Sequence, residues 1–284
     1  MNYDNTSYWQ DIHQQFSGQL RAVGYSDLSE AFNVLKYQSE TDTLLTILNA
    51  IRPHLENKTP LTMLEIGAGT GYWIRIVSEW FRRKGSTVEM SALDLSREAL
   101  NIIRARYPAA KTIQADLKCI DPDLHAMKFD MVMSFYCLHH LTQPDGFLNA
   151  LNFAARSVRP DGFFIIMDPV LSMPFSPFDA INLSTYQGNG IPRRLTFLDD
   201  ALSKEGLKRK MFVPAVSFLL NGTIEDNARI DYGIKRSLWF LLKIVYRSDM
   251  LTTLLRPYLI QLDTHLKQKN RAFSSSICVY QKLS

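Results

Sequence analysis

The chain has 284 residues, of which 46% are hydrophobic and 21% charged, and a formal net charge of +4 at pH 7. These values predict a sizeable core, argue against a wholly disordered chain and do not by themselves indicate a nucleic-acid partner. The three cysteines, Cys119, Cys137 and Cys278, have no metal-ligand spacing, so we expect reduced thiols, a cytoplasmic protein and no metal site. The N-terminus lacks the basic flank and apolar core of a secretion signal, and no apolar run reaches the ~20 residues of a membrane-spanning helix.

The middle of the chain alternates strand-like and helix-like segments. Strands are predicted at 61–66, 87–95, 110–116, 129–136 and 159–168. Helices are predicted at 72–83, at 96–107 with Ser96 as its N-cap, and at 144–158 with Pro144 in its first turn. Apolar strands that alternate with helices predict a parallel sheet covered on both faces.

The flanking segments are less regular. Residues 1–58 predict a helical cap, and 169–195 have the prolines and glycines of a long lid loop. Thr196 and Asp199 have the spacing of a capping box, which predicts a helix from there to Gly206.

The remainder of the chain is expected to complete the sheet around a helical insertion. A strand is predicted at 208–218, amphipathic helices over 223–270 and a last strand at 274–282. The expected parts are therefore a cap at 1–58, a core at 59–218 plus 273–284, and a helical insertion at 219–272.

The stretch LEIGAGTGYW, at 64–73, places an acid at the end of an apolar strand and three glycines directly after it. In an open parallel sheet, ligands bind beyond the carboxyl ends of the strands, where glycines let the backbone approach them closely. Asp94 and Asp116 end the next two strands, so together with Glu65 they form a row of acids along one crevice. Such a row suits a nucleoside with a cationic tail.

A dinucleotide is the first alternative for this loop. Its fingerprint is G-x-G-x-x-G, in which a helix N-terminus holds a pyrophosphate. Here the spacing is G-x-G-x-G, with Tyr72 where the third glycine would fall. Glu65 would also repel a pyrophosphate, whereas it could hold an ammonium group. The predicted ligand therefore has a ribose and a positively charged amino-acid end, a description that S-adenosylmethionine fits.

At these residues the chain resembles the class I S-adenosylmethionine-dependent methyltransferases. LEIGAGTG is similar to the family's first motif, and ALDLS, IQADL, FDMVMSFYCLHHL and RPDGFFIIMD follow in order as its second- to fifth-strand motifs. The resemblance covers 60–168 and the last strand. It implies an α/β, Rossmann-like, doubly wound seven-stranded sheet whose last strand is antiparallel, with N-terminal helices and a helical insertion before the last strand.

The resemblance also implies which residues bind the cofactor. The first motif would line its methionine part, Asp94 and Leu95 its ribose, and Asp116 and Leu117 its adenine. The implied contacts are Glu65, Gly67, Ala68, Gly69, Gly71, Trp73, Asp94, Leu95, Ala115, Asp116, Leu117, Ser134 and Phe135. Trp73 is equally a candidate core residue, because a large aromatic just inside a helix often packs inward.

The fourth-strand motif bears on the acceptor. Family members that methylate the amino groups of nucleobases have Asn/Asp-Pro-Pro-Tyr/Phe there, whereas SFYCLHHL looks like the branch that modifies quinones and other small molecules. His139 and His140 are candidate catalytic bases for an acceptor proton, and Tyr136 is a candidate catalytic contact. For His140, a packing or capping role is an equal alternative. The scattered histidines, among them His13, are expected mostly on the surface.

The insertion has an unusual charge balance. Residues 204–272 contain 13 Lys/Arg and 6 Asp/Glu, and basic residues are interleaved with a run of apolar ones at 238–245. This composition predicts a lid over an apolar substrate or peripheral membrane contact through 235–256. An ordinary amphipathic helix that covers the sheet with its lysines in water stays open as the alternative.

From the sequence we therefore expect an S-adenosylmethionine-dependent methyltransferase that acts on a small, apolar or aromatic acceptor by in-line displacement. Methyl transfer to RNA or protein is the first alternative, although the fourth-strand motif disfavours a nucleic-acid partner. A non-catalytic scaffold that only binds the cofactor is the second. The acceptor atom and the oligomeric state stay open.

Overall fold

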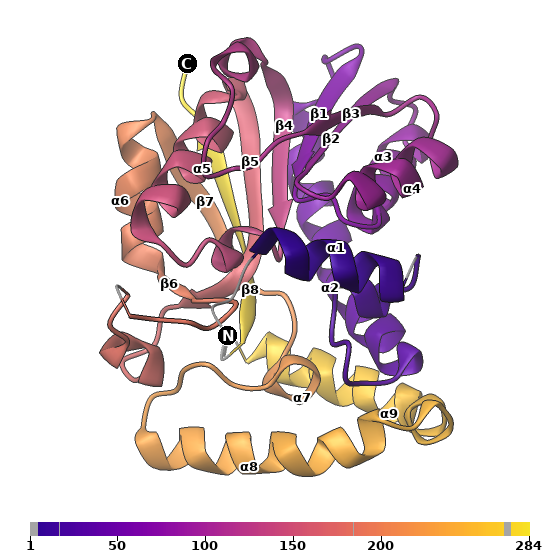
Figure 1. The fold of residues 1–284 in the computed structure, drawn as a ribbon, viewed down its shortest axis with the longest axis vertical. Helices are drawn as coiled ribbons and strands as arrows, with labels where there is room; N and C mark the ends of the chain where they lie inside the picture. Colours follow the sequence, from indigo (N-terminus) through magenta and orange to yellow (C-terminus); the bar gives the residue numbers. More distant parts are fainter. Residues whose placement is uncertain (1–4, 17, 184, 270–273) are drawn as a thin grey trace.

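A computed structural model describes residues 5–16, 18–183, 185–269 and 274–284 (Figure 1). Its central sheet has the strand order β3-β2-β1-β4-β5-β8-β7, and β8 runs antiparallel to both of its neighbours. The strands are β1 (Leu61–Ile66), β2 (Val88–Asp94), β3 (Lys111–Gln114), β4 (Phe129–Phe135), β5 (Val158–Leu171), β7 (Leu207–Pro214) and β8 (Ser275–Lys282). The predicted seven-stranded sheet with an antiparallel last strand is confirmed, and the two-residue strand β6 (Arg193–Arg194) pairs with β5 in addition. The predicted domain boundary at 272/273 lies outside the described residues.

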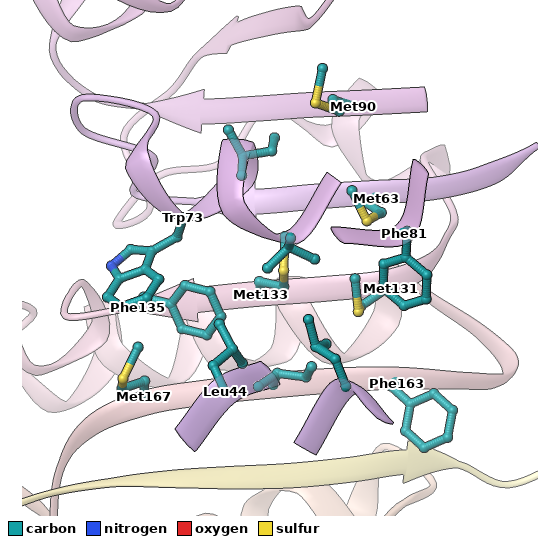
Figure 2. Close-up of a cluster of buried hydrophobic side chains, with 14 of the residues drawn as sticks. Leu44, Met63, Trp73, Phe81, Met90, Met131, Met133, Phe135, Phe163 and Met167 are labelled. Atoms are coloured by element: carbon teal, nitrogen blue, oxygen red, sulfur yellow. The ribbon is translucent and has the colours of Figure 1, made fainter. Parts of the chain in front are cut away.

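Helices cover both faces of the sheet, as predicted. α2 (Glu30–Ile51) and α3 (Tyr72–Arg83) pack on one face, and α5 (Pro144–Arg156) and α6 (Leu195–Lys204) pack on the other. Within β4, Met131 and Met133 belong to the first core cluster and Val132 to the second, because successive strand side chains point to opposite faces. Figure 2 shows the first cluster, in which the rings of Trp73 and Phe135 have centroids 5.4 Å apart.

The other helices lie around this layered core. They are α1 (Asn5–Gln15), α7 (Phe218–Asn221), α8 (Arg229–Tyr246) and α9 (Asp249–Gln268), whereas α4 (Arg97–Arg106) packs on the sheet through Leu100 and Ile103 of the first cluster. The Ser96 hydroxyl accepts a hydrogen bond from the Ala99 N–H, so the predicted N-cap of α4 is confirmed. A third core cluster joins α2 to α7, α8 and α9 through Phe32, Trp239 and Tyr246. Within the described residues, no helix is both long enough and apolar enough to cross a membrane.

The predicted capping box at Thr196 is wrong. α6 begins one residue earlier, at Leu195, and the residue before it, Arg194, makes no capping hydrogen bond with its side chain. Asp199 instead accepts hydrogen bonds from Arg209 of β7 and Tyr280 of β8. Contacts with distant strands therefore override the local capping pattern.

The fifth strand is longer than predicted. It continues past Asp168 through Pro169 to Leu171, with Pro169 paired to Ser275 of β8. Proline has no backbone N–H to donate to a neighbouring strand. Pro169 is tolerated because the pairing of β4 with β5 ends at Met167, so no β4 residue lies opposite Pro169. The irregular segment that the sequence predicts as a lid loop therefore begins only after residue 171.

Candidate active site

A cavity opens at the carboxyl ends of β1, β2 and β4, with α1 lying across it (Figure 1). It has about 90 Å³ available to the centres of water-sized molecules, which is room for several waters. Twelve of the predicted site residues line this cavity, namely Gly67, Ala68, Gly69, Trp73, Asp94, Leu95, Ala115, Asp116, Leu117, Phe135, Tyr136 and His140. The predicted residues Glu65, Gly71, Ser134 and His139 do not. None of the described residues of 219–269 lines it either.

The glycine loop after β1 forms the floor of the cavity. Gly67 has φ +70°, and a Cβ built there would lie 2.3 Å from the Cys137 sulfur. Gly69 has φ +50°, and its Cβ would lie 2.7 Å from Val23. Both positions therefore require glycine, because other residues rarely adopt these angles and would clash with their neighbours. Gly71 packs against α4 instead, since its Cβ would meet Ile103 at 3.0 Å.

Asp94 joins this loop to the end of β2. Its carboxylate accepts a hydrogen bond from the Gly69 N–H at 2.8 Å and another from the Ser96 N–H at 2.8 Å. Burial raises the pKa of Asp94, and the backbone N–H donors oppose that rise by stabilising the charged form. Each oxygen retains a second acceptor site, so the fixed carboxylate can accept hydrogen bonds from a ligand in the cavity.

Glu65 is fully buried beneath the loop and outside the cavity lining. Burial raises the pKa of its carboxyl well above the ordinary range, and the Ile74 N–H at the start of α3 opposes that rise. Neither oxygen makes a hydrogen bond of acceptable geometry within the described part of the chain. An unpaired buried carboxyl group is costly, so a bound cationic group would relieve this site.

The adenine-side residues lie at the end of β3 as the resemblance implies. Ala115, Asp116 and Leu117 follow the strand directly and line the cavity. The Asp116 side chain accepts a hydrogen bond from the Lys118 N–H at 2.9 Å, which fixes the turn. By contrast, Ser134 is fully buried in β4, and its hydroxyl makes no hydrogen bond of acceptable geometry among the described residues.

Helix α1 contributes residues that the sequence analysis missed. Trp9 and His13 line the cavity, and His13 is only 2% exposed rather than on the surface, so that prediction is wrong for it. Within the described residues the His13 Nδ1 is buried without a hydrogen-bond partner. Burial lowers the pKa of His13, and the charges of Asp94 and Glu98 oppose that change. The i, i+4 spacing of Trp9 and His13 on one helix face was the available signal.

Tyr136 directs its hydroxyl away from the cavity. The hydroxyl lies within hydrogen-bond distance of Glu40 on α2 and is 2.6 Å from the Ser275 Oγ. The Lys36 ammonium lies 3.9 Å from the ring centroid. Burial raises the pKa of Tyr136 well above its ordinary value, so the phenol stays protonated. The backbone of Tyr136 has φ +54°, which is uncommon for a residue other than glycine. The contacts of the hydroxyl hold the ring against the cavity, so the hydroxyl is not available as a base.

The two adjacent histidines of the 3-10 helix η4 (Leu138–His140) have different surroundings. The His139 Nδ1 is 2.7 Å from a carboxylate oxygen of Asp168, in a separate space of about 10 Å³ that also includes Arg193. That space holds one water at most. Burial lowers the pKa of His139 to about 3 and raises that of Asp168 to about 8, so the pair is uncharged as a whole at pH 7.

His140 lies on the main cavity. Its Nδ1 is hydrogen-bonded to the Asn189 carbonyl oxygen, which can only accept, so Nδ1 carries the proton and Nε2 has the free lone pair. Burial and the neighbouring His139 lower the pKa of His140 to about 3, so it is neutral at pH 7. Trp9 contacts the ring edge-on, with centroids 4.9 Å apart.

Part of the chain is similar in sequence to known methyltransferases. Residues 63–162 match the family model described as methyltransferase domain, about a third of the chain. The N-methyltransferase vrtF of Penicillium aethiopicum is 31% identical over 123 residues, 36% of this chain and 48% of that protein. The O-methyltransferase adaD of Aspergillus niger is 28% identical over 128 residues, 36% of this chain and 49% of that protein. The match thus spans about half the length of these relatives.

A solved structure extends the similarity in fold to most of the chain. It is a proposed sarcosine dimethylglycine methyltransferase from Galdieria sulphuraria, with a TM-score of 0.52 and 14% identity. The superposition covers 86% of this chain and 85% of that one. Together with the strand order, it shows that most of the chain has the Rossmann-like fold of that protein, and residues 63–162 within it match the methyltransferase domain model.

Proposed function

We propose that this chain transfers a methyl group from S-adenosylmethionine to a small, apolar or aromatic acceptor. The observation that carries the proposal is the glycine-floored cavity at the carboxyl ends of the strands, bordered by the fixed carboxylate of Asp94. A Cβ at Gly67 or Gly69 would collide with neighbouring side chains, so the floor is kept as bare backbone. The unpaired carboxyl of Glu65 directly below it suits a ligand with a cationic end.

The residues around the cavity fit the parts of this cofactor. Asp94 would accept hydrogen bonds from the ribose hydroxyls, and Asp116 with Leu117 would bind the adenine. Glu65 lies two residues before Gly67, and a cationic group bound against the glycine loop would lower the raised pKa of its unpaired carboxyl. When bound, the cofactor supplies a methyl group on a positively charged sulfur that is already activated for displacement. The protein's contribution is therefore to hold the acceptor in line and to manage its proton.

His140 is the residue that we assign to the acceptor proton. It is neutral at pH 7, and Nε2 has the free lone pair. A pKa of about 3 makes it a weak base, so we expect it to accept a hydrogen bond from the acceptor's O–H or N–H first. It would take the proton only during methyl transfer, when the acceptor atom becomes strongly acidic.

The small-molecule class of the acceptor has two supports. The fourth strand continues into SFYCLHHL instead of the motif typical of nucleobase amino methylation. Two relatives that match over about half their length are named as an N- and an O-methyltransferase. The cap at 1–58 fits the same proposal, because Trp9 and His13 of α1 help to enclose the cavity.

The test is transfer of a labelled methyl group from S-adenosylmethionine. Purified protein is incubated with phenols, hydroxyquinones and aliphatic amines, and separately with RNA and with unfolded protein. We expect labelling of a small molecule, its loss in Asp94→Ala, and its retention in Asp200→Ala, a control at an exposed residue of α6. Labelling of RNA or protein alone would favour the alternative acceptors, and absence of labelling from every acceptor would contradict the proposal.

A further inference from the structure

An apolar surface on the two long C-terminal helices stands apart from the cavity. Of the fifteen large hydrophobic side chains that the described residues leave exposed, twelve lie on α8 and α9. The most exposed include Ile234, Leu241 and Ile244 on α8 and Met250, Leu254 and Tyr258 on α9, each between 63% and 74% exposed. These six residues define the α8–α9 apolar face. Large exposed apolar surfaces on soluble proteins often mark interaction sites.

This face is additional to the one that the helices bury. Trp239 and Tyr246 on α8 and Leu259 on α9 point inward and belong to the third core cluster with α2. The exposed residues recur at helical spacing on the outward sides, as in 250, 254 and 258. α8 lies at one end of the molecule's long axis, with its own axis across it (Figure 1). A flat surface can therefore meet α8 along its whole length.

The charges around this face are mostly positive. Residues 229–269 contain eight Lys/Arg and three Asp. Three of the basic residues are paired with acids, Lys235 with Asp226, Lys243 with Asp27 and Lys267 with Asp263. Asp249 accepts a hydrogen bond from the Ala31 N–H. Arg236 on α8 and Arg247, the residue directly after α8, are both exposed. The face therefore combines exposed apolar side chains with a net positive charge.

A second copy of the chain fits this surface less well than an anionic partner does. In a two-fold symmetric contact the same patch meets itself, so the arginines of one copy would approach those of the other. Anionic lipid headgroups instead attract Lys and Arg, while the acyl boundary accepts Ile, Leu and Phe side chains.

We propose that the α8–α9 apolar face docks on the surface of an anionic phospholipid bilayer, with α8 lying in the interfacial plane. Ile234, Leu241 and Ile244 insert at the headgroup boundary, and Arg236 and Arg247 pair with lipid phosphates. This docking does not depend on which acceptor is methylated, because no described residue of α8 or α9 lines the cavity.

Vesicle sedimentation of the full chain tests the proposal. We expect binding to vesicles of phosphatidylcholine and phosphatidylglycerol at 3:1, weak binding to phosphatidylcholine alone, and release as salt screens the arginines. Leu241→Glu combined with Ile244→Glu should weaken binding at least about tenfold, because two apolar side chains are replaced by charges that anionic lipids repel. Arg236→Gln combined with Arg247→Gln should remove the preference for anionic lipid.

Leu283→Glu is the matched control, since Leu283 is 54% exposed on another part of the molecule. It should bind vesicles as the wild type does, and melting curves of all variants should confirm that they fold. Wild-type protein that fails to sediment with anionic vesicles would overturn the proposal. The proposal would also be overturned if light scattering shows a dimer that Leu241→Glu combined with Ile244→Glu dissociates, and if the protein does not bind vesicles. That result would assign the face to a second copy of the chain.

Discussion

Replacing Gly67 by alanine tests the geometry of the cavity floor. At φ +70° an alanine occupies the left-handed region, which costs about 1–2 kcal/mol for a residue with a Cβ. The new Cβ would lie 2.3 Å from the Cys137 sulfur and 2.5 Å from its Cβ, so the two chain segments must separate. Such overpacking typically costs about 1–3 kcal/mol. We expect Gly67→Ala to lower the free energy of unfolding by about 2–5 kcal/mol in total.

Urea denaturation of a double-mutant cycle separates the two contributions. Cys137→Gly removes both atoms that the new Cβ would meet, but it does not change the backbone angle at position 67. The double variant should therefore recover the steric part, seen as a coupling of about 1–3 kcal/mol between the two substitutions. Additive effects would show that the backbone angle alone matters. A loss below about 0.5 kcal/mol in Gly67→Ala would refute the close approach that the structure shows.

Three further predictions concern the histidines of the cavity. His13→Ala should weaken S-adenosylmethionine binding about two- to tenfold in calorimetry, because the substitution removes an unpaired polar side chain from the cavity lining; unchanged affinity would remove His13 from the site. His140→Ala should lower kcat for an O–H acceptor by about 10²-fold or more while cofactor affinity is retained, and an equal loss of cofactor binding would assign His140 to binding instead. Burial lowers the folded-state pKa of His140 to about 3, so the unfolded state binds more protons between that value and about pH 6.5, and stability falls as pH decreases through this window. We expect the free energy of unfolding, measured in urea, to fall between pH 6.5 and pH 5.5 by less in His140→Gln than in wild type, with a difference of at most about 1.4 kcal/mol. Equal decreases in the two proteins would contradict the low pKa of His140.

The sheet was predictable because its signals are local. Continuous apolar runs predicted β1, β2 and β4 within a residue or two, and the Ser96 cap depends only on atoms three residues apart. The glycine loop was also predictable, since its backbone angles limit residue choice at each position separately. The structure adds the physical reason for Gly67, which is its contact with Cys137, 70 positions along the chain.

Features that depend on distant contacts were not predictable. Tyr136 was a reasonable candidate from its place after β4, but Glu40 on α2 and Ser275 on β8 determine where its hydroxyl lies. His13 could not be distinguished from a surface histidine until α1 was placed over Gly69. Asp199 had the spacing of a capping residue, yet Arg209 and Tyr280 engage it instead. In each case a residue far away in sequence decides between two locally acceptable arrangements.

The surface on the C-terminal helices for which we propose membrane docking was only partly predictable from the sequence. Sequence composition showed that basic and apolar residues are interleaved at 238–245, which suits both a lid and an interfacial helix. The structure shows which apolar residues are buried, such as Trp239, and which are exposed, such as Leu241. Only this separation of the two faces makes the docking proposal testable by paired substitutions.

Titration of S-adenosylhomocysteine into the purified protein, followed by calorimetry, tests the central claim most directly. We expect one binding site per chain in wild type and an affinity at least about tenfold lower in Asp94→Ala, because charged hydrogen bonds to the ribose are lost. Asp200→Ala should bind as the wild type does. Absence of binding heat in wild type for both this compound and S-adenosylmethionine, or an unchanged affinity in Asp94→Ala, would contradict the placement of the cofactor in this cavity.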